Sequence, residues 1–206
     1  MIGYYNYTVI LTYVGTMFGF AGIVSVWAGN LRLSLICLLF AGLCDMFDGK
    51  VASTMKRTKE EKHFGIEIDS LSDLICFGVL PALIIFHCSG RNLWYAPICA
   101  LYMLCALIRL AWFNVDEGKR QEKEDGARRV YLGLPVTTST LLIPLTVSLL
   151  NLLCVDQRHV SPWVLLGMGA AFLSPFRLPK PHMAGKIVMT ALGVGCLVVV
   201  LLGVPS

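Results

Sequence analysis

Four aspartates stand at the ends of two consecutive apolar segments. Asp45 and Asp48 close the first segment, and Asp69 and Asp73 open the second. On helices these spacings place each pair on one face, one turn apart. A carboxylate in or near lipid is unfavourable unless it is paired, hydrated or bound to a cation. Because carboxylate oxygens are hard ligands that suit Mg²⁺ or Mn²⁺, the aspartates predict a divalent-metal site that shares its coordination with a substrate phosphate.

Small residues accompany these aspartates. Gly49 follows Asp48 directly, Ala52 lies one turn further on, and Gly65 lies one turn before Asp69. Small side chains beside metal ligands let a substrate backbone or phosphate come close, which is the role we predict for them. Three other glycines in the first apolar segment are better explained by close packing between helices. These are Gly15, Gly19 and Gly22.

The composition indicates a membrane protein. Of 206 residues, 56% are hydrophobic and 15% are charged, and the mean hydropathy is +0.71, whereas soluble domains carry about 25% charged residues. A water-soluble fold of this size does not bury so much apolar surface. These numbers exclude a soluble globular domain, a disordered chain and a nucleic-acid-binding module. The eight cysteines form no C-x-x-C pair and lie mostly in apolar runs, so we interpret them as small hydrophobic residues.

Apolar segments of about 20 residues, long enough to cross a bilayer, recur along the chain. A single spanning segment satisfies its own backbone groups within lipid only as a helix. We therefore expect an all-α polytopic membrane protein, a single domain over residues 1–206 with about seven (six to eight) transmembrane helices. The expected spans are 8–28, 32–55, 65–88, 93–115, 132–154, 161–176 and 183–204. The first span has no basic residue before it, and we expect no cleaved signal peptide.

Basic residues crowd one side of this seven-span arrangement. Thirteen of the seventeen lysines and arginines fall there, around residues 50–62, 119–129 and 177–186, and the opposite side holds three. The positive-inside rule places the crowded side, and the N-terminus with it, in the cytoplasm. Both aspartate pairs then lie near the cytoplasmic end of two neighbouring helices. The remaining basic residue, Arg109, lies within a span.

The aspartates belong to a longer pattern. The chain reads D-M-F-D-G-K-V-A-S over residues 45–53 and G-I-E-I-D-S-L-S-D over residues 65–73. This resembles the signature of the CDP-alcohol phosphatidyltransferases, D-x-x-D-G-x-x-A-R followed after a spacer by G-x-x-x-D-x-x-x-D. Seven of its eight fixed positions match, and the exception is the arginine, which is Ser53 here. The spacer, residues 54–64, is longer than is usual in the family.

Softer similarities connect the chain to one branch of the family, the phosphatidylserine synthases. It shares with them F-G-x-x-P after Asp73, an R-L-x-x-F-N stretch that begins at Arg109, and a G-L-P sequence that begins at Gly133. The first span, from Thr12, resembles theirs without its asparagine. The resemblance covers about residues 12–182. It implies transfer of the phosphatidyl group from CDP-diacylglycerol to the hydroxyl of L-serine, which gives phosphatidylserine and CMP.

The resemblance also implies roles for individual residues. Asp45, Asp48 and Asp69 would hold metal, with two Mg²⁺ or Mn²⁺ ions in the site. Asp73 would be the general base for the serine hydroxyl and would also touch the second ion. The expected contacts with CDP-diacylglycerol come from the signature, its spacer and the first span. They are Gly49, Ala52, Gly65, Thr12 and Lys56.

The resemblance extends to partners and location. It implies a homodimer that is surrounded by membrane lipids and has no nucleic-acid partner. Together with the charge distribution, it predicts a multi-pass protein of a prokaryotic plasma membrane whose active site faces the cytoplasm.

Selection of serine requires a group that binds its carboxylate. Arginine does this with two parallel hydrogen bonds, and Arg109 is the one basic residue within a span. We predict that Arg109, with Asn114, recognises serine or the acceptor-side phosphate. The alternative is an arginine that extends its head group to the membrane interface.

Other functions fit the pattern less well. A synthase of the same family that uses glycerol 3-phosphate or inositol phosphate is the main alternative. Intramembrane prenyltransferases also pair aspartate motifs, but the D-G-x-x-A element has no place in them. A transporter would spread its acids through the membrane and show repeated halves, whereas these acids cluster and no repeat is visible.

Overall fold

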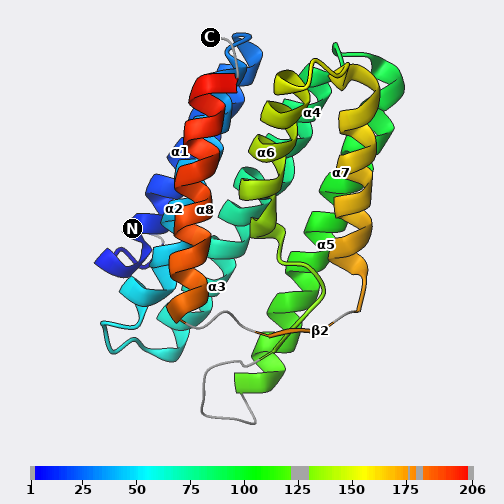
Figure 1. The fold of residues 1–206 in the computed structure, drawn as a ribbon. Coiled ribbons are helices and arrows are strands. Elements are labelled where there is room, and N and C mark those ends of the chain that lie inside the picture. Colours follow the sequence, from blue (N-terminus) through cyan, green and yellow to red (C-terminus); the bar gives the residue numbers. More distant parts are fainter. Residues whose placement is uncertain (1–2, 122–129, 176, 180–182, 204–206) are drawn as a thin grey trace.

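The computed structural model describes residues 3–121, 130–175, 177–179 and 183–203. Within them, helices run side by side and form a bundle (Figure 1). Two three-residue strands, β1 (Val130–Leu132) and β2 (Arg177–Pro179), pair in antiparallel register at one end of it. The helices are α1 (Ile10–Trp27), α2 (Leu31–Ala52), α3 (Lys59–Asp73), α4 (Leu80–Cys88), α5 (Ala96–Gln121), α6 (Ser139–Leu152), α7 (Gln157–Leu173) and α8 (Met183–Gly203).

The helices of the described residues confirm the predicted all-α membrane fold. A π-helical segment, Leu74–Val79, joins α3 to α4 without a break, so the two helices make one continuous rod. The bundle then has seven rods in the described part of the chain, one for each expected span. Short 3₁₀ turns precede α1, α5 and α6.

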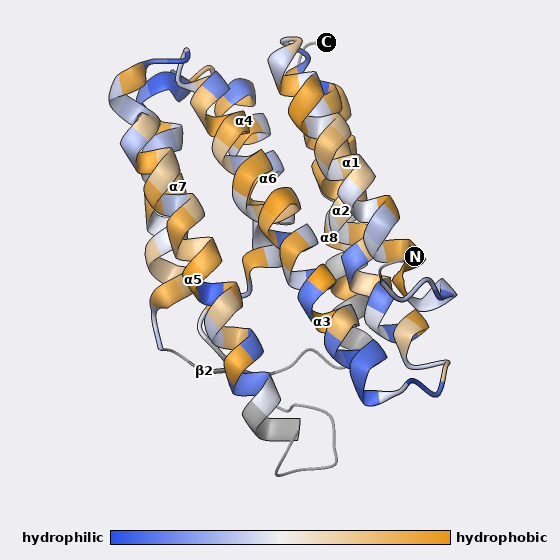
Figure 2. Ribbon diagram, turned by 180° about the vertical axis from the view of Figure 1, so that it is seen from behind, coloured by the Kyte–Doolittle hydropathy of each residue, from blue (hydrophilic) through white to orange (hydrophobic). Residues whose placement is uncertain are grey.

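Three of the described helical stretches are long and apolar enough by themselves to cross a membrane. They are Tyr7–Trp27, Lys59–Cys88 and Leu93–Gly118. Two shorter apolar stretches, Val136–Leu152 and Thr190–Leu202, accompany them. Helix α2 has the length, 22 residues, but its aspartates and basic residues reduce its apolar character. Figure 2 shows the same contrast, with apolar residues along the rods and hydrophilic residues gathered toward their ends.

Several predicted boundaries differ from the helix ends, and two of them have clear local reasons. Thr58 and Glu61 form a capping box, in which the Glu61 amide donates to Thr58 Oγ1 (3.2 Å) and the Thr58 amide donates to Glu61 Oε2 (2.8 Å). Because this box satisfies the first free amides of the helix, α3 begins at residue 59 and not at 65. The span expected from residue 132 begins instead at 139, because residues 130–132 pair with β2.

The glycines of α1 pack against neighbouring helices, as predicted. A β-carbon on Gly19 would lie 2.6 Å from Cys76 Sγ, and one on Gly22 would lie 2.7 Å from Leu80 Cδ2. A β-carbon on Gly15 would lie 3.3 Å from the β-carbon of Cys44 on α2. The absence of side chains on this face lets α1 approach both aspartate-bearing rods closely.

A proline fixes the middle of the α3–α4 rod. Pro81 has no amide hydrogen, so it cannot donate to the carbonyl of Phe77 one turn earlier. The Tyr102 hydroxyl of α5 donates to that carbonyl at 2.8 Å, and the Ser139 hydroxyl donates to it at 3.4 Å. A buried carbonyl thus obtains partners from two other rods, which ties the segment after Asp73 to the centre of the bundle.

The connections divide between the two ends of the bundle. The α2–α3 turn, the end of α5 and the β1–β2 pair lie at one end in Figure 1, and the α1–α2, α4–α5 and α6–α7 turns lie at the other. The first end carries the sequence groups that are rich in lysine and arginine. The helical topology therefore brings the described members of the predicted basic groups, at residues 50–62, 119–120, 177 and 186, to one side, whereas Lys123, Arg128, Arg129 and Lys180 lie outside the described residues.

Candidate metal and substrate site

Three carboxylates meet between α2 and α3. One oxygen each from Asp45, Asp48 and Asp69 lies within 4.8 Å of the other two, and all three residues are partly buried. The i, i+3 spacing on α2 and the close packing of α1 against both rods bring the groups together. Three like charges at this separation repel one another strongly unless a cation joins them. An all-oxygen donor set of this kind fits a hard divalent ion.

Asp73 lies beside this group without belonging to it. It ends α3 directly before the π-helical segment, and it lines the same cavities as the other three aspartates. All four predicted aspartates thus converge on one region. Asp73 lies outside the group of three clustered oxygens. This position is compatible with a role in the site other than that of the three clustered aspartates.

A cavity of about 630 Å³ adjoins the carboxylates. Its walls come from five rods and the turn before α6. Besides Asp69 and Asp73 of α3, α2 provides Met46, α5 provides Arg109, α6 provides Leu141, and α8 provides Val194. Most of the remaining lining is also apolar, apart from the aspartates, Arg109 and a few threonines. The cavity therefore combines an anionic end with a long apolar wall, which suits a substrate that is part phosphate and part lipid.

Arg109 is inside the bundle. It is 6% exposed, its Nε donates to the Leu134 carbonyl at 3.3 Å, and its guanidinium carbon lies 5.7 Å from the ring centre of Trp112. This burial contradicts the alternative of an arginine that extends to the interface. The predicted serine-binding arginine and the four aspartates share one cavity.

A tight turn supports that arginine. Gly133 has φ +72°, and a β-carbon there would lie 2.8 Å from the Ser174 carbonyl oxygen. Glycine alone fits this close approach without strain. The Leu134 amide donates to Ala171 O at 3.3 Å, so the turn is held against α7 while its carbonyl receives Arg109.

The small residues of the signature have different surroundings. Gly49 lines the cavity, and no described heavy atom lies within 4 Å of the place where its β-carbon would stand. Gly65 faces a guanidinium, because its β-carbon would lie 3.1 Å from Arg57 Nη1. Ala52, the last residue of α2, is partly buried and lies outside the described lining of the large cavity.

Three further candidates lie outside the large cavity as the described residues form it. Thr12 is buried and lines a small gap between α1, α2 and α3, together with the four aspartates. Lys56 is exposed on the α2–α3 turn. Asn114 accepts a 2.8 Å hydrogen bond from the Ser70 hydroxyl, which links α5 to α3 one residue from Asp69.

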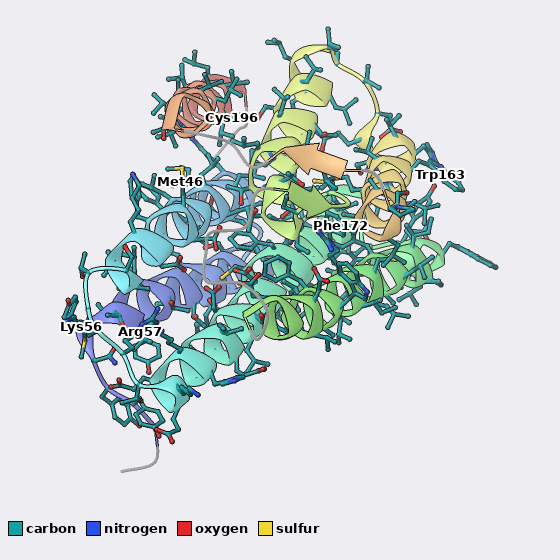
Figure 3. The ribbon with its side chains drawn as sticks, turned by 90° about the horizontal axis from the view of Figure 1, so that it is seen from below. Met46, Lys56, Arg57, Trp163, Phe172 and Cys196 are labelled. Atoms are coloured by element: carbon teal, nitrogen blue, oxygen red, sulfur yellow. The ribbon has the colours of Figure 1, made fainter. Side chains whose placement is uncertain are left out.

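The walls on α6 and α8 were missed by sequence reasoning. Thr137 and Thr138 in the turn before α6 and Thr140 on α6 line the cavity, and the V-T-T-S-T sequence after the G-L-P turn was the available signal. The α8 residues Thr190 and Gly193 also line it. The Thr190 hydroxyl donates to Met46 Sδ at 3.7 Å, and Figure 3 shows Met46 pointing from α2 toward α8. No residue pattern indicated that α8 packs there.

Fold and site together define a polytopic membrane protein with an acidic, metal-compatible centre that opens into a largely apolar cavity. Residues 5–175 match the family described as CDP-alcohol phosphatidyltransferase. Since the match spans most of the chain, the protein belongs to the CDP-alcohol phosphatidyltransferase family.

Individual relatives carry more specific names. The chain is 32% identical over 143 residues to a CDP-diacylglycerol–serine O-phosphatidyltransferase of Saccharomyces cerevisiae. The aligned region covers 64% of this chain and 50% of the relative. It is 32% identical over 137 residues to the Helicobacter pylori enzyme of that name, covering 64% and 54%. It is 28% identical over 175 residues to an archaetidylserine synthase of Methanothermobacter thermautotrophicus, covering 83% and 68%. The chain thus spans about half the length of the yeast and Helicobacter relatives.

Proposed function

We propose that this protein transfers the phosphatidyl group of CDP-diacylglycerol to the hydroxyl of L-serine. The observation that carries the proposal is the shared cavity, in which three clustered carboxylates and the buried Arg109 face one apolar-walled space. The names of the yeast, bacterial and archaeal relatives support serine as the acceptor.

The aspartates divide the chemistry. Asp45, Asp48 and Asp69 would hold two divalent ions, Mg²⁺ or Mn²⁺, with Asp73 touching the second. Bound metal there supplies charge neutralisation to the nucleotide diphosphate. Asp73 accepts the proton of the serine hydroxyl. The serine oxygen then forms a bond to the phosphorus that carries diacylglycerol, and the bond from that phosphorus to the CMP oxygen breaks.

Arg109 orients the acceptor. Its guanidinium matches the serine carboxylate in two parallel hydrogen bonds, and the Leu134 carbonyl and the Trp112 ring hold it in the cavity wall. Holding the acceptor near Asp73 converts a bimolecular encounter into a local reaction. Asn114 contributes by fixing α5 against α3 through Ser70.

The donor occupies the rest of the site. Gly49 leaves open space for the diphosphate beside Asp48, and Ala52, Gly65, Thr12 and Lys56 are the further candidates for contact with the CDP-diacylglycerol head group. The apolar walls of α2, α6 and α8 receive the lipid chains.

Location and assembly complete the proposal. We place the protein in a prokaryotic plasma membrane, with the site on the cytoplasmic side, because basic residues concentrate at the end that carries the aspartates. Bacterial and archaeal relatives support this location, and the yeast relative leaves a eukaryotic membrane as the alternative. The functional unit is a homodimer.

The deciding experiment measures CMP release from CDP-diacylglycerol by the purified protein. Serine, glycerol 3-phosphate and inositol phosphate are offered separately, with and without Mg²⁺ or Mn²⁺. We expect metal-dependent release with serine. Release with glycerol 3-phosphate or inositol phosphate alone would reject the serine assignment, and release without metal would reject the carboxylate site.

A further inference from the structure

An arginine outside the family signature is partly enclosed against the first part of α3. Arg57 follows α2 on the turn to α3, yet it is only partly exposed. Its Nε is buried and has no hydrogen-bond partner among the described residues. Figure 3 places Arg57 further into the bundle than its neighbour Lys56, which lies at the outer edge. A buried, unsatisfied guanidinium nitrogen is unfavourable, so an anionic partner is expected for it.

The position of this guanidinium is defined by Gly65. Arg57 Nη1 lies 3.1 Å from where a β-carbon on Gly65 would stand, so the head group rests against the bare face of α3. Asp69 is on that face one turn later, about 6 Å along the helix. The guanidinium is thus one helical turn from a carboxylate of the metal-compatible cluster, on the side of the α2–α3 turn.

Neighbouring polar groups on the turn are already engaged or point outward. The Ser53 hydroxyl donates to the Lys50 carbonyl at 2.7 Å and is exposed. The Thr54 hydroxyl donates to the Val51 carbonyl at 2.8 Å. Among the described basic residues of the turn, Arg57 is the one that combines partial burial with a place against α3.

We propose that the guanidinium of Arg57 binds the diphosphate of the nucleotide donor where it passes Gly65. Guanidinium groups bind phosphate oxygens with two parallel hydrogen bonds. The diphosphate brings its own negative charge to a site that already holds three clustered carboxylates, and Arg57 neutralises part of that charge from the α2–α3 turn. This inference rests on the proposed function, since it needs a CDP-linked donor.

Nucleotide binding tests the proposal without requiring turnover. The dissociation constants of CDP, CMP and cytidine are measured with Mg²⁺ for the wild type, Arg57→Ala, Arg57→Lys and Lys62→Ala in detergent. Lys62 is an exposed lysine of α3, so Lys62→Ala removes one positive charge nearby without touching Gly65. We expect Arg57→Ala to weaken CDP binding about 10- to 100-fold, the size typical of a hydrogen bond to a charged group. CMP should be weakened less and cytidine not at all, with Arg57→Lys in between.

The outcomes separate this inference from the proposed function. Suppose that the wild type releases CMP with serine and that Arg57→Ala binds CDP as tightly as Lys62→Ala does. This result would overturn the role of Arg57 and leave the proposed function intact. Equal weakening of cytidine and CDP would show that Arg57 supports the fold, and would overturn it as well. Wild-type protein that neither binds CDP nor releases CMP with any acceptor would overturn both.

Discussion

The Tyr102 hydroxyl donates a 2.8 Å hydrogen bond to the carbonyl oxygen of Phe77. This bond connects α5 to the rod that carries Asp69 and Asp73. Pro81 has no amide hydrogen, so this carbonyl lacks its usual donor within the helix. Tyr102 is completely buried. The bond therefore fixes the π-helical segment directly after the acidic site. A strained or irregular helical segment beside reacting groups is common in proteins, and here it is stabilised from a neighbouring rod.

Removal of this hydroxyl should destabilise the protein. Tyr102→Phe leaves the Phe77 carbonyl with the longer Ser139 bond, and we expect a loss of about 1–2 kcal/mol in the free energy of unfolding. Denaturant unfolding in detergent measures it. The control is Tyr4→Phe, whose ring is exposed beside Phe64 and which should change the stability by less than about 0.5 kcal/mol.

A carboxylate of the cluster should be required for metal binding. Asp48→Asn keeps the shape of the side chain but removes a charged oxygen ligand, so we expect weaker Mn²⁺ binding. The activity should fall by more than the roughly 10- to 100-fold that is typical when a residue that only hydrogen-bonds to a metal ligand is replaced. Mn²⁺ titration and CMP release measure the two effects. Asp156→Asn is the matched control, because Asp156 caps α7 at the other end of the bundle and asparagine caps equally well. Unchanged Mn²⁺ affinity in Asp48→Asn would contradict the metal site.

Arg109 should determine the affinity for serine. Arg109→Lys retains the charge but not the paired hydrogen bonds, so we expect the KM for serine to rise about 10-fold while the KM for CDP-diacylglycerol stays near its wild-type value. Arg109→Ala should raise the serine KM further. Steady-state kinetics with each substrate varied in turn gives both constants. A serine KM that does not change in either variant would refute the role of Arg109.

The α8 wall should limit the space for the lipid donor. Gly193 lines the cavity, and a β-carbon there would lie 3.9 Å from Leu141 Cδ2, so Gly193→Phe would fill part of the apolar space. We expect the KM for long-chain CDP-diacylglycerol to rise several-fold, and that for a short-chain donor to rise less. Gly195→Phe is the control, since Gly195 is exposed and no described heavy atom is within 4 Å of its β-carbon position. The same response to both donors would argue against lipid chains at this wall.

Short-range periodicity and composition predicted the helices and the faces on which the aspartates lie. Apolar runs predict the spans because a bilayer accepts little else, and the spacing of Asp45 with Asp48 and of Asp69 with Asp73 places each pair on one helical face. The small residues of α1 indicated close packing. These local rules were enough to identify the acidic site and its class of chemistry.

How distant segments complete that site depends on tertiary packing. The pairing of residues 130–132 with 177–179 and the α8 wall involve contacts between segments far apart in the chain. Hydropathy does not encode which rods become neighbours, because within lipid every apolar face is acceptable and association depends on fit between particular side chains. The burial of Arg109 likewise could not be predicted from the sequence, because it depends on the Leu134 carbonyl, which accepts a hydrogen bond from the Arg109 side chain.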